Sequence, residues 1–311
     1  MADKKKIILD VDPGHDDAVA ILLAAKNEKL DLKGITVVAG NQTLEKTLQN
    51  TLNVCSFAGL NDIPIFAGMA KPLVREQVIA DDIHGDSGLD GPQFPKSTLK
   101  EEDKHAVDFI IEECLAAEDG ITLIPTGPLT NIAMALIREP KIKENIDEIV
   151  LMGGSYTLGN TTPAAEFNIY VDGEAAKVVF ESGLDITMVG LDLTHQAKAY
   201  PEIVERIAEI DNDVSNLVVE LLKFFGYTYN RVFDFDAPPL HDVCAVAGVI
   251  DKDVFTSRKM RVDIETDSEL NYGRTVCDFY GVVDKEANAE VALDLNKELF
   301  WDLLIEALKK Y

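Results

Sequence analysis

The sequence predicts an α/β protein built on one open, mainly parallel sheet flanked by helices, with a β-rich C-terminal extension. From residue 5 to about residue 250, short apolar segments of strand length alternate with helical segments. This alternation is typical of a parallel sheet with helical crossovers. The last sixty residues hold three strand-like segments close together before a final helix. No repeat, low-complexity tract or Pro- and Ser-rich linker divides the chain, so residues 1–311 are expected to form a single domain.

The first element is an apolar strand over residues 5–11, which ends at an Asp-Val-Asp-Pro-Gly segment that a strand cannot continue through. Residues 18–25 form an Ala- and Leu-rich run with the composition and length of a helix. The other expected strands are at residues 34–39, 64–66, 121–124, 148–152, 185–189, 259–264, 275–279 and 289–293. The other expected helices are at residues 44–58, 104–117, after Pro128, at 174–181, twice within 202–225, at 242–250 and at the C-terminus. Residues 70–102 are irregular, and a loop of that length in a compact domain is usually functional.

The composition excludes several kinds of partner. The chain has 29 Lys and Arg against 55 Asp and Glu, a formal net charge of −26. Because an acidic surface repels phosphate, neither a nucleic acid nor a membrane surface is expected as a partner. No apolar run approaches the roughly 20 residues of a membrane span. The residues before Asp10 lack the apolar core of a secretory leader, so a cytoplasmic location is expected.

A cluster of aspartates follows the first strand. Four lie within eight residues: Asp10, Asp12, Asp16 and Asp17. If they converged without a cation they would repel one another, and convergent carboxylate oxygens suit Ca²⁺ or Mg²⁺ and not zinc. An EF-hand does not fit, because Gly14 and His15 stand where that loop needs an oxygen ligand and then a glycine. Capping of the following helix by Asp16 or Asp17 is an alternative explanation for those two residues.

The segment from Asp10 to Ala18 reads Asp-Val-Asp-Pro-Gly-His-Asp-Asp-Ala and resembles the N-terminal signature of the inosine–uridine preferring nucleoside hydrolases. Other motifs of that family recur in order at residues 38–41, 83–85, 125–131, 152–154, 159–160, 165–169 and 241–242. The resemblance implies the nucleoside hydrolase fold with its Rossmann-like core. It also implies hydrolysis of the N-glycosidic bond of ribonucleosides (uridine, cytidine and inosine) to free base and ribose, through an oxocarbenium-like transition state.

The resemblance further implies roles for individual residues. Asp12, Asp17, Asp242 and the backbone carbonyl of Thr126 would hold one Ca²⁺, and Asp12 would be the general base for a water on that ion. His241 would protonate the leaving base, and His15 would support its neighbours without taking part in catalysis. The residues expected to contact the sugar are Asp16, Asn41, Asn160, Glu166 and Asn168, and those on the base side are His84 and Tyr229. Relatives are usually homotetramers or dimers, so a homo-oligomer is expected.

Base preference and two rival functions stay open at this stage. Residues 41–43, His84 and His241 resemble the branch with pyrimidine-preferring and broad-specificity members, whereas Tyr229 favours tolerance of purines. We therefore expect pyrimidines to be somewhat favoured. One alternative is a non-catalytic, calcium-dependent nucleoside- or ribose-binding protein, although binding alone does not need the base Asp12. The other is a phosphohydrolase that uses two of the aspartates, which the Pro13 turn fits poorly.

Overall fold

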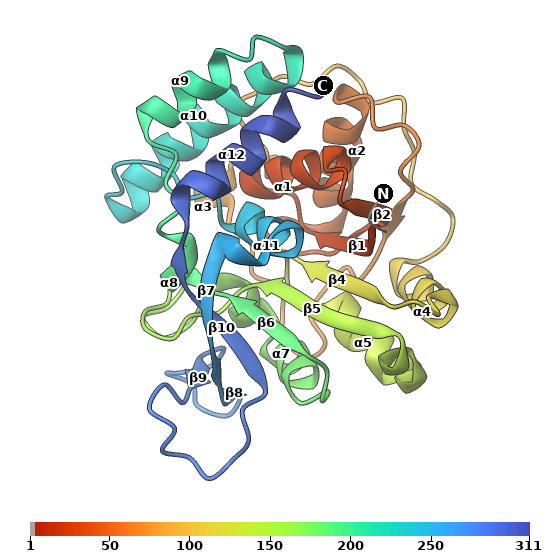
Figure 1. Ribbon diagram of the computed structural model, residues 1–311, viewed down its shortest axis with the longest axis vertical. Helices are drawn as coiled ribbons and strands as arrows, with labels where there is room; N and C mark the ends of the chain where they lie inside the picture. Colours follow the sequence, from red (N-terminus) through yellow and green to blue (C-terminus); the bar gives the residue numbers. More distant parts are fainter. Residues whose placement is uncertain (1–3) are drawn as a thin grey trace.

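The computed structural model describes residues 4–311 and centres on an eight-stranded sheet (Figure 1). In spatial order its strands are β3 (Ile65–Ala67), β2 (Leu30–Val37), β1 (Lys5–Val11), β4 (Ile121–Pro125), β5 (Ile146–Met152), β6 (Ile186–Val189), β10 (Ala289–Leu295) and β7 (Phe255–Met260). All neighbouring strands are parallel except β10 and β7. The predicted open, mainly parallel sheet is therefore confirmed, and its first six strands have the 3-2-1-4-5-6 order of a Rossmann-type core.

This strand order determines where a ligand can bind. From β1 the chain adds β2 and β3 on one side, and it then returns to place β4, β5 and β6 on the other side. The loops that leave the carboxyl ends of β1 and β4 thus diverge at a topological switch point, where open α/β sheets bind their ligands. Asp12 opens the first of these loops and Thr126 opens the second.

Helices cover both faces of the sheet. One face carries α1 (His15–Lys26), α2 (Leu44–Phe57), α9 (Pro201–Ala208), α10 (Asp213–Phe233), α11 (His241–Ile250) and α12 (Lys297–Leu308). The opposite face carries α4 (Ala106–Ala116), α5 (Thr130–Arg138) and α7 (Gly173–Phe180). Because successive strand side chains point to opposite faces, Ile7 and Leu9 enter the first core and Ile8 enters the second.

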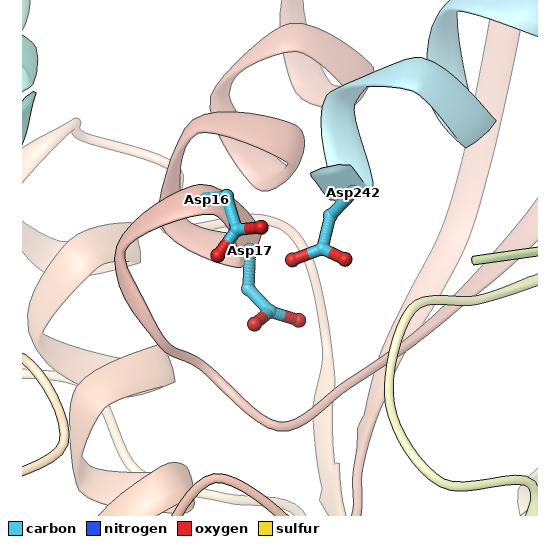
Figure 2. Close-up of side chains that lie close together, drawn as sticks. All are labelled: Asp16, Asp17 and Asp242. Carbon is cyan, nitrogen blue, oxygen red and sulfur yellow. The ribbon is translucent and has the colours of Figure 1, made fainter. Parts of the chain in front are cut away.

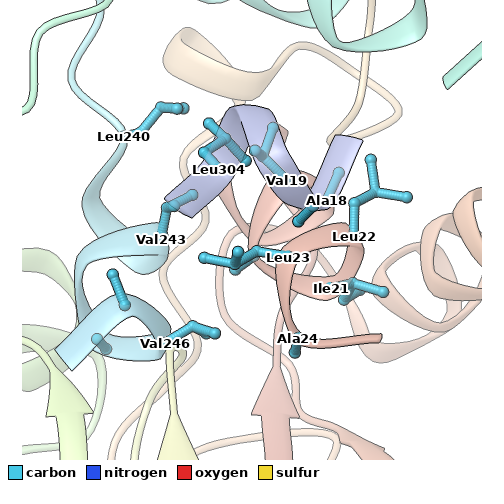
Figure 3. Packing of buried hydrophobic residues seen from close by; sticks show 14 of the residues in the cluster. Ala18, Val19, Ile21, Leu22, Leu23, Ala24, Leu240, Val243, Val246 and Leu304 are labelled. Carbon is cyan, nitrogen blue, oxygen red and sulfur yellow. The ribbon is translucent and has the colours of Figure 1, made fainter. Parts of the chain in front are cut away.

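The helix α1 lies in the middle of the first core. Its side chains pack between α11 and α12, where Leu23 lies near Val243 and Val19 near Leu304 (Figure 3). All positions from Ala18 to Leu23 are fully buried, which explains why this helix is apolar on every side. The same packing holds the first turns of α1 and α11 next to each other.

The C-terminal part differs from the prediction in its detail. β10 and β7 extend the main sheet, and only β8 (Val262–Ile264) and β9 (Thr275–Cys277) form a small separate antiparallel sheet. The strand expected at residues 259–264 is divided between β7 and β8. Short elements without a periodic signal were not predicted: α3 (Asp81–His84), α6 (Phe167–Val171), α8 (Leu191–Thr194) and the 3₁₀ turns Pro140–Glu144 and Lys252–Val254.

Strands from both ends of the chain share the main sheet, and a single domain over residues 1–311 stays a prediction. Within residues 4–311, no helix combines the length and the apolar character needed to cross a bilayer.

Replacing Leu23 by Ala is expected to lower the free energy of unfolding by about 2–5 kcal/mol, because a fully buried side chain is lost from the core beneath the aspartates. Chemical denaturation followed by circular dichroism measures the change. Leu270→Ala is the control, since that side chain is 85% exposed and its loss should change stability by less than about 0.5 kcal/mol. Equal stabilities of the two variants would contradict the assigned packing.

Candidate active site

Three aspartates meet where α1 and α11 begin. Asp16 and Asp17 lie in the first turn of α1, and Asp242 lies in the first turn of α11. One carboxylate oxygen from each lies within 4.8 Å of those of the others (Figure 2). All three side chains are buried, and the partial positive charge at the start of each helix points toward them.

Asp12 lies beside this group, and two glycine-containing loops approach its carboxylate closely. Its Oδ2 accepts a hydrogen bond from the Asn41 backbone amide at 2.7 Å, whereas its buried Oδ1 has no partner among residues 4–311. A Cβ on Gly40 would lie 2.1 Å from Oδ2, and a Cβ on Gly127 would lie 2.5 Å from Oδ1. Only glycines let the two loops approach the carboxylate so closely. A buried carboxylate oxygen without a partner is costly, which points to a ligand at this position.

Asp17 joins the loops of β1 and β4. Its carboxylate accepts hydrogen bonds from the Gly14 amide at 3.0 Å and from the Thr126 hydroxyl at 2.8 Å. The Asp12 amide donates to it at 3.3 Å. The carbonyl oxygen of Thr126 accepts a hydrogen bond from Asn168 Nδ2 at 2.7 Å. The two loops of the switch point are thus held together through one carboxylate.

Burial and mutual repulsion disfavour the charged form of these acids. Burial, with the nearby charge of Asp17, raises the pKa of Asp16 to about 7. Burial and the neighbouring aspartates raise the pKa values of Asp12 and Asp242 well above their usual range. A divalent cation with a preference for oxygen ligands, such as Ca²⁺ or Mg²⁺, would relieve this repulsion.

Two of the four predicted metal ligands belong to the group of three aspartates, and the other two lie next to it. Asp17 and Asp242 belong to the group of three, and Asp12 and Thr126 are hydrogen-bonded to Asp17 beside it. The third member of the group is Asp16, which the sequence assigned to the sugar. Its Oδ2 accepts a hydrogen bond from the His241 amide at 3.2 Å.

Asp10 lies apart from this group, although its position on the strand suggested otherwise. Its carboxylate accepts hydrogen bonds from the Thr36 hydroxyl at 2.5 Å and from Asn131 Nδ2 at 2.8 Å. Asn131 Nδ2 also donates to the Val37 carbonyl. Asp10 therefore connects β1, β2 and α5 behind the site.

A cavity of about 260 Å³ opens next to the acids. All residues predicted to contact the sugar or the base line it: Asp16, Asn41, His84, Asn160, Glu166, Asn168 and Tyr229. His241, Asp242 and Thr126 line it as well, and no Lys or Arg is among its lining residues within 4–311. The volume suits a small-molecule ligand, and the carboxyl groups in the lining make the cavity acidic.

The polar wall of the cavity is held by backbone hydrogen bonds. The Glu166 carboxylate accepts from the amides of Gly154 at 2.8 Å and Asn168 at 2.9 Å, and burial raises its pKa to about 7. Asn168 Nδ2 also donates to the Met152 carbonyl at the end of β5. Asn160 Oδ1 accepts a hydrogen bond from the backbone amide of Phe167. These bonds orient the side chains without any contact to a ligand.

Part of the cavity lining is aromatic, and it includes a histidine whose two ring nitrogens both contact hydroxyl groups. His241 Nε2 lies 2.6 Å from the Tyr229 hydroxyl, and its Nδ1 lies 2.7 Å from the Thr194 hydroxyl. Burial lowers the pKa of His241 well below its usual range. Phe225 and Phe233, one helical turn on either side of Tyr229, also line the cavity.

Sequence reasoning missed Phe225, Phe233 and Thr194. The four-residue spacing of Phe225, Tyr229 and Phe233 indicates one helix face and could have revealed the first two. Thr194 has no comparable signal, because its contact joins residues 47 positions apart.

Comparisons with known proteins agree with this geometry. Residues 7–302 match the family model described as inosine-uridine preferring nucleoside hydrolase. The pyrimidine-specific ribonucleoside hydrolase RihB of Escherichia coli O157:H7 is 47% identical over 309 residues, which are 99% of this chain and 98% of the relative. The solved structure of a purine-preferring ribonucleoside hydrolase from Gardnerella vaginalis has a TM-score of 0.91 at 30% identity and covers 99% of this chain and 100% of its own. A plant nucleoside hydrolase has a TM-score of 0.90 at 32% identity, with 99% of both chains covered.

Added Ca²⁺ is expected to raise the melting temperature by about 2–5 °C, because the ion binds only the folded arrangement of the acids. Differential scanning fluorimetry with metal-free protein measures the shift. In the Asp242→Asn variant the shift should disappear. It should persist in Glu269→Gln, which removes an exposed carboxylate that belongs neither to the group nor to the cavity lining. An unchanged shift in Asp242→Asn would rule out this cation site.

Proposed function

We propose that this chain, which belongs to the inosine–uridine preferring nucleoside hydrolase family, hydrolyses the N-glycosidic bond of uridine, cytidine and inosine to free base and ribose. Its class as an enzyme acting on N-glycosyl compounds follows from the family. The observation that carries the proposal is one cavity lined both by the carboxylates of Asp16, Glu166 and Asp242 and by the hydrogen-bonded Tyr229–His241 pair.

The lining of the cavity supports a neutral substrate. A nucleotide would bring a phosphate toward acidic side chains, with no Lys or Arg among the lining residues described within 4–311 to receive it. A nucleoside carries no such charge. The similarity to a pyrimidine-specific hydrolase at 47% identity supports a preference for pyrimidines over purines.

We assign one Ca²⁺ to Asp12, Asp17, Asp242 and the backbone carbonyl of Thr126. The crowding of the carboxylates fits a hard cation with oxygen ligands. When bound, calcium would hold the ribose 2′- and 3′-hydroxyls and lower the pKa of the attacking water.

The carboxylates of the chain have two roles in bond cleavage. Asp12 takes a proton from the attacking water, since its Oδ1 has no protein partner among residues 4–311. Asp16 and Glu166 line the cavity and stabilise the positive charge that develops on the oxocarbenium-like sugar. The side chains of Asn41, Asn160 and Asn168, which line the cavity, orient the ribose.

The leaving base is assisted from the aromatic part of the lining. Both ring nitrogens of His241 are engaged, one with Thr194 and one with Tyr229. His241 therefore acts on the base through the Tyr229 hydroxyl, which lines the cavity beside it. This arrangement modifies the direct protonation by His241 that the family resemblance implied.

Asp12→Asn is expected to lower kcat for uridine by about 100-fold or more, because the base for the water is lost. Removal of calcium by a chelator should abolish activity, and added Ca²⁺ should restore it. Release of free base and ribose from uridine, cytidine and inosine is the measurement, with Glu269→Gln as the unaffected control. Full activity in the chelator, or in Asp12→Asn, would contradict the mechanism.

Tyr229→Phe is expected to lower kcat for uridine at least about tenfold and to change p-nitrophenyl riboside hydrolysis much less. Nitrophenolate leaves readily without a proton donor, whereas a pyrimidine does not. Tyr227→Phe on the same helix is the matched control, because that ring is 64% exposed. An equal loss on both substrates in Tyr229→Phe would show that the hydroxyl does not assist the leaving group.

A further inference from the structure

The small sheet of β8 and β9 (Figure 1) contributes no residue to the cavity lining, yet the segment that leads into β9 contacts the chain around Glu166. A Cβ on Gly273 would lie 2.7 Å from the Cα of Tyr170 and 3.3 Å from the Cβ of Ala165. The φ of Gly273 is +78°, a conformation that glycine adopts without strain. Residues 273–275 therefore lie directly against the part of the chain that carries Glu166.

Thr275 makes two hydrogen bonds to a loop of the active site. Its hydroxyl accepts a hydrogen bond from the Ser155 amide at 2.9 Å and donates one to the Ser155 carbonyl oxygen at 2.6 Å. Both residues are buried. A buried backbone amide or carbonyl without a partner is unfavourable, so one side chain satisfies two groups that would otherwise be costly.

The residue before Ser155 reaches the active-site carboxylate. The Gly154 amide donates a hydrogen bond to Glu166 Oε2 at 2.8 Å. The other hydrogen bonds to this carboxylate within 4–311 come from α6, the helix that Glu166 itself caps, and their donors are the amides of Asn168 and Ile169. The Gly154 amide thus fixes the carboxylate relative to the end of β5, which α6 alone does not do.

The Gly154 amide depends on contacts from outside its own loop. Gly154 lies two residues beyond the end of β5, and its φ is +72°. Because glycine leaves the backbone free to adopt many conformations, the turn needs other groups to hold it. The Leu191 amide donates to the Gly154 carbonyl at 2.9 Å, and the Thr275 hydroxyl accepts from the Ser155 amide. These two contacts hold both ends of one peptide group, next to the one that donates to the carboxylate.

We propose that Thr275 is a positioning residue of the sugar site, which holds the Gly154 amide against the Glu166 carboxylate. The carboxylate is then in place to stabilise the positive charge that develops on the ribose. The sheet of β8 and β9 is thus a supporting part of the active site. The role of Glu166 in the reaction rests on the proposed function, whereas the contacts of Thr275 with Ser155 belong to the fold itself.

Thr275→Val tests the proposal, because it keeps the shape of the side chain and removes both hydrogen bonds. We expect kcat for uridine to fall about ten- to 100-fold and KM to change less than about threefold, since the sugar becomes positive only in the transition state. The kcat for p-nitrophenyl riboside should fall by a similar factor, because it has the same sugar. An increase in KM with an unchanged kcat would overturn the proposal.

Two further substitutions separate the hydroxyl from the rest of the side chain. Thr275→Ser keeps the hydroxyl and should restore kcat to within about twofold of the unmodified protein. Thr256→Val is the matched control, since it removes an exposed threonine hydroxyl from β7 and should leave kcat unchanged. Circular dichroism checks the fold of each variant. If Thr275→Val does not fold, Thr275→Cys takes its place, because a thiol is a much weaker donor and acceptor. A loss in Thr275→Ser as large as in Thr275→Val would overturn the role of the hydroxyl.

A double-mutant cycle shows whether Thr275 acts through Glu166. Glu166→Gln removes the charge that the hydrogen bond positions. In that background, Thr275→Val should lower kcat less than about twofold, because the two changes affect one interaction. A purely structural role of Thr275 would instead give the full loss again in the double variant, and that result would overturn the proposal.

Hydrogen–deuterium exchange of residues 153–157, measured by mass spectrometry, tests the contact without any substrate. Thr275→Val should speed exchange in this segment about fivefold or more, the loss of about one hydrogen bond, and Thr256→Val should not. Unchanged exchange in Thr275→Val would overturn the proposal, whether or not the protein hydrolyses nucleosides. Failure of the unmodified protein to release base from any nucleoside would instead contradict the proposed function, and the exchange would still decide whether Thr275 holds this loop.

Discussion

The crowding of buried carboxylates at the start of two helices is the constraint on which the rest of the site depends. The side chains of Asp16, Asp17 and Asp242 are buried, and no Lys or Arg is among the residues within 4–311 that line the adjoining cavity. Such an arrangement is unfavourable unless the surrounding fold holds it rigidly. The helix α1, buried from His15 to Ala24, and its packing against α11 provide that rigidity. Glycines at 40 and 127 let the neighbouring loops approach Asp12 closely.

The lining of the cavity combines acidic and aromatic side chains. Next to the acids, the electrostatic potential favours a cation and a sugar that becomes positive during bond cleavage. Tyr229, His84 and His241 line the same cavity, where the proposed reaction places the leaving base. Each histidine there is held by a specific partner, Thr194 for one and His15 for the other.

Local pattern predicted the elements that have a strong periodic or apolar signal. The strands before Asp12 and Thr126, the buried helix α1 and the mainly parallel sheet all follow from it. It did not predict α6 or α8, because a helix of about one turn is too short to show the 3.6-residue hydrophobic periodicity. The sequence also grouped Asp10 with the other three aspartates, whereas hydrogen bonds from Thr36 and Asn131 hold Asp10 apart from them.

By itself, the sequence determined the fold class, the strand ends that carry polar residues and, through its motifs, the family and the candidate residues. These depend on neighbours in the chain: apolar alternation, turn residues and the spacing of Asp16 and Asp17. The tertiary structure brought Asp242, which only the family resemblance had grouped with Asp17, next to both aspartates, although its neighbour His241 is 225 positions from Asp16. It also decided that Tyr229 stands beside His241 and that His15 contacts His84. Contacts of this kind depend on strand order and helix packing, and local sequence patterns do not specify either one.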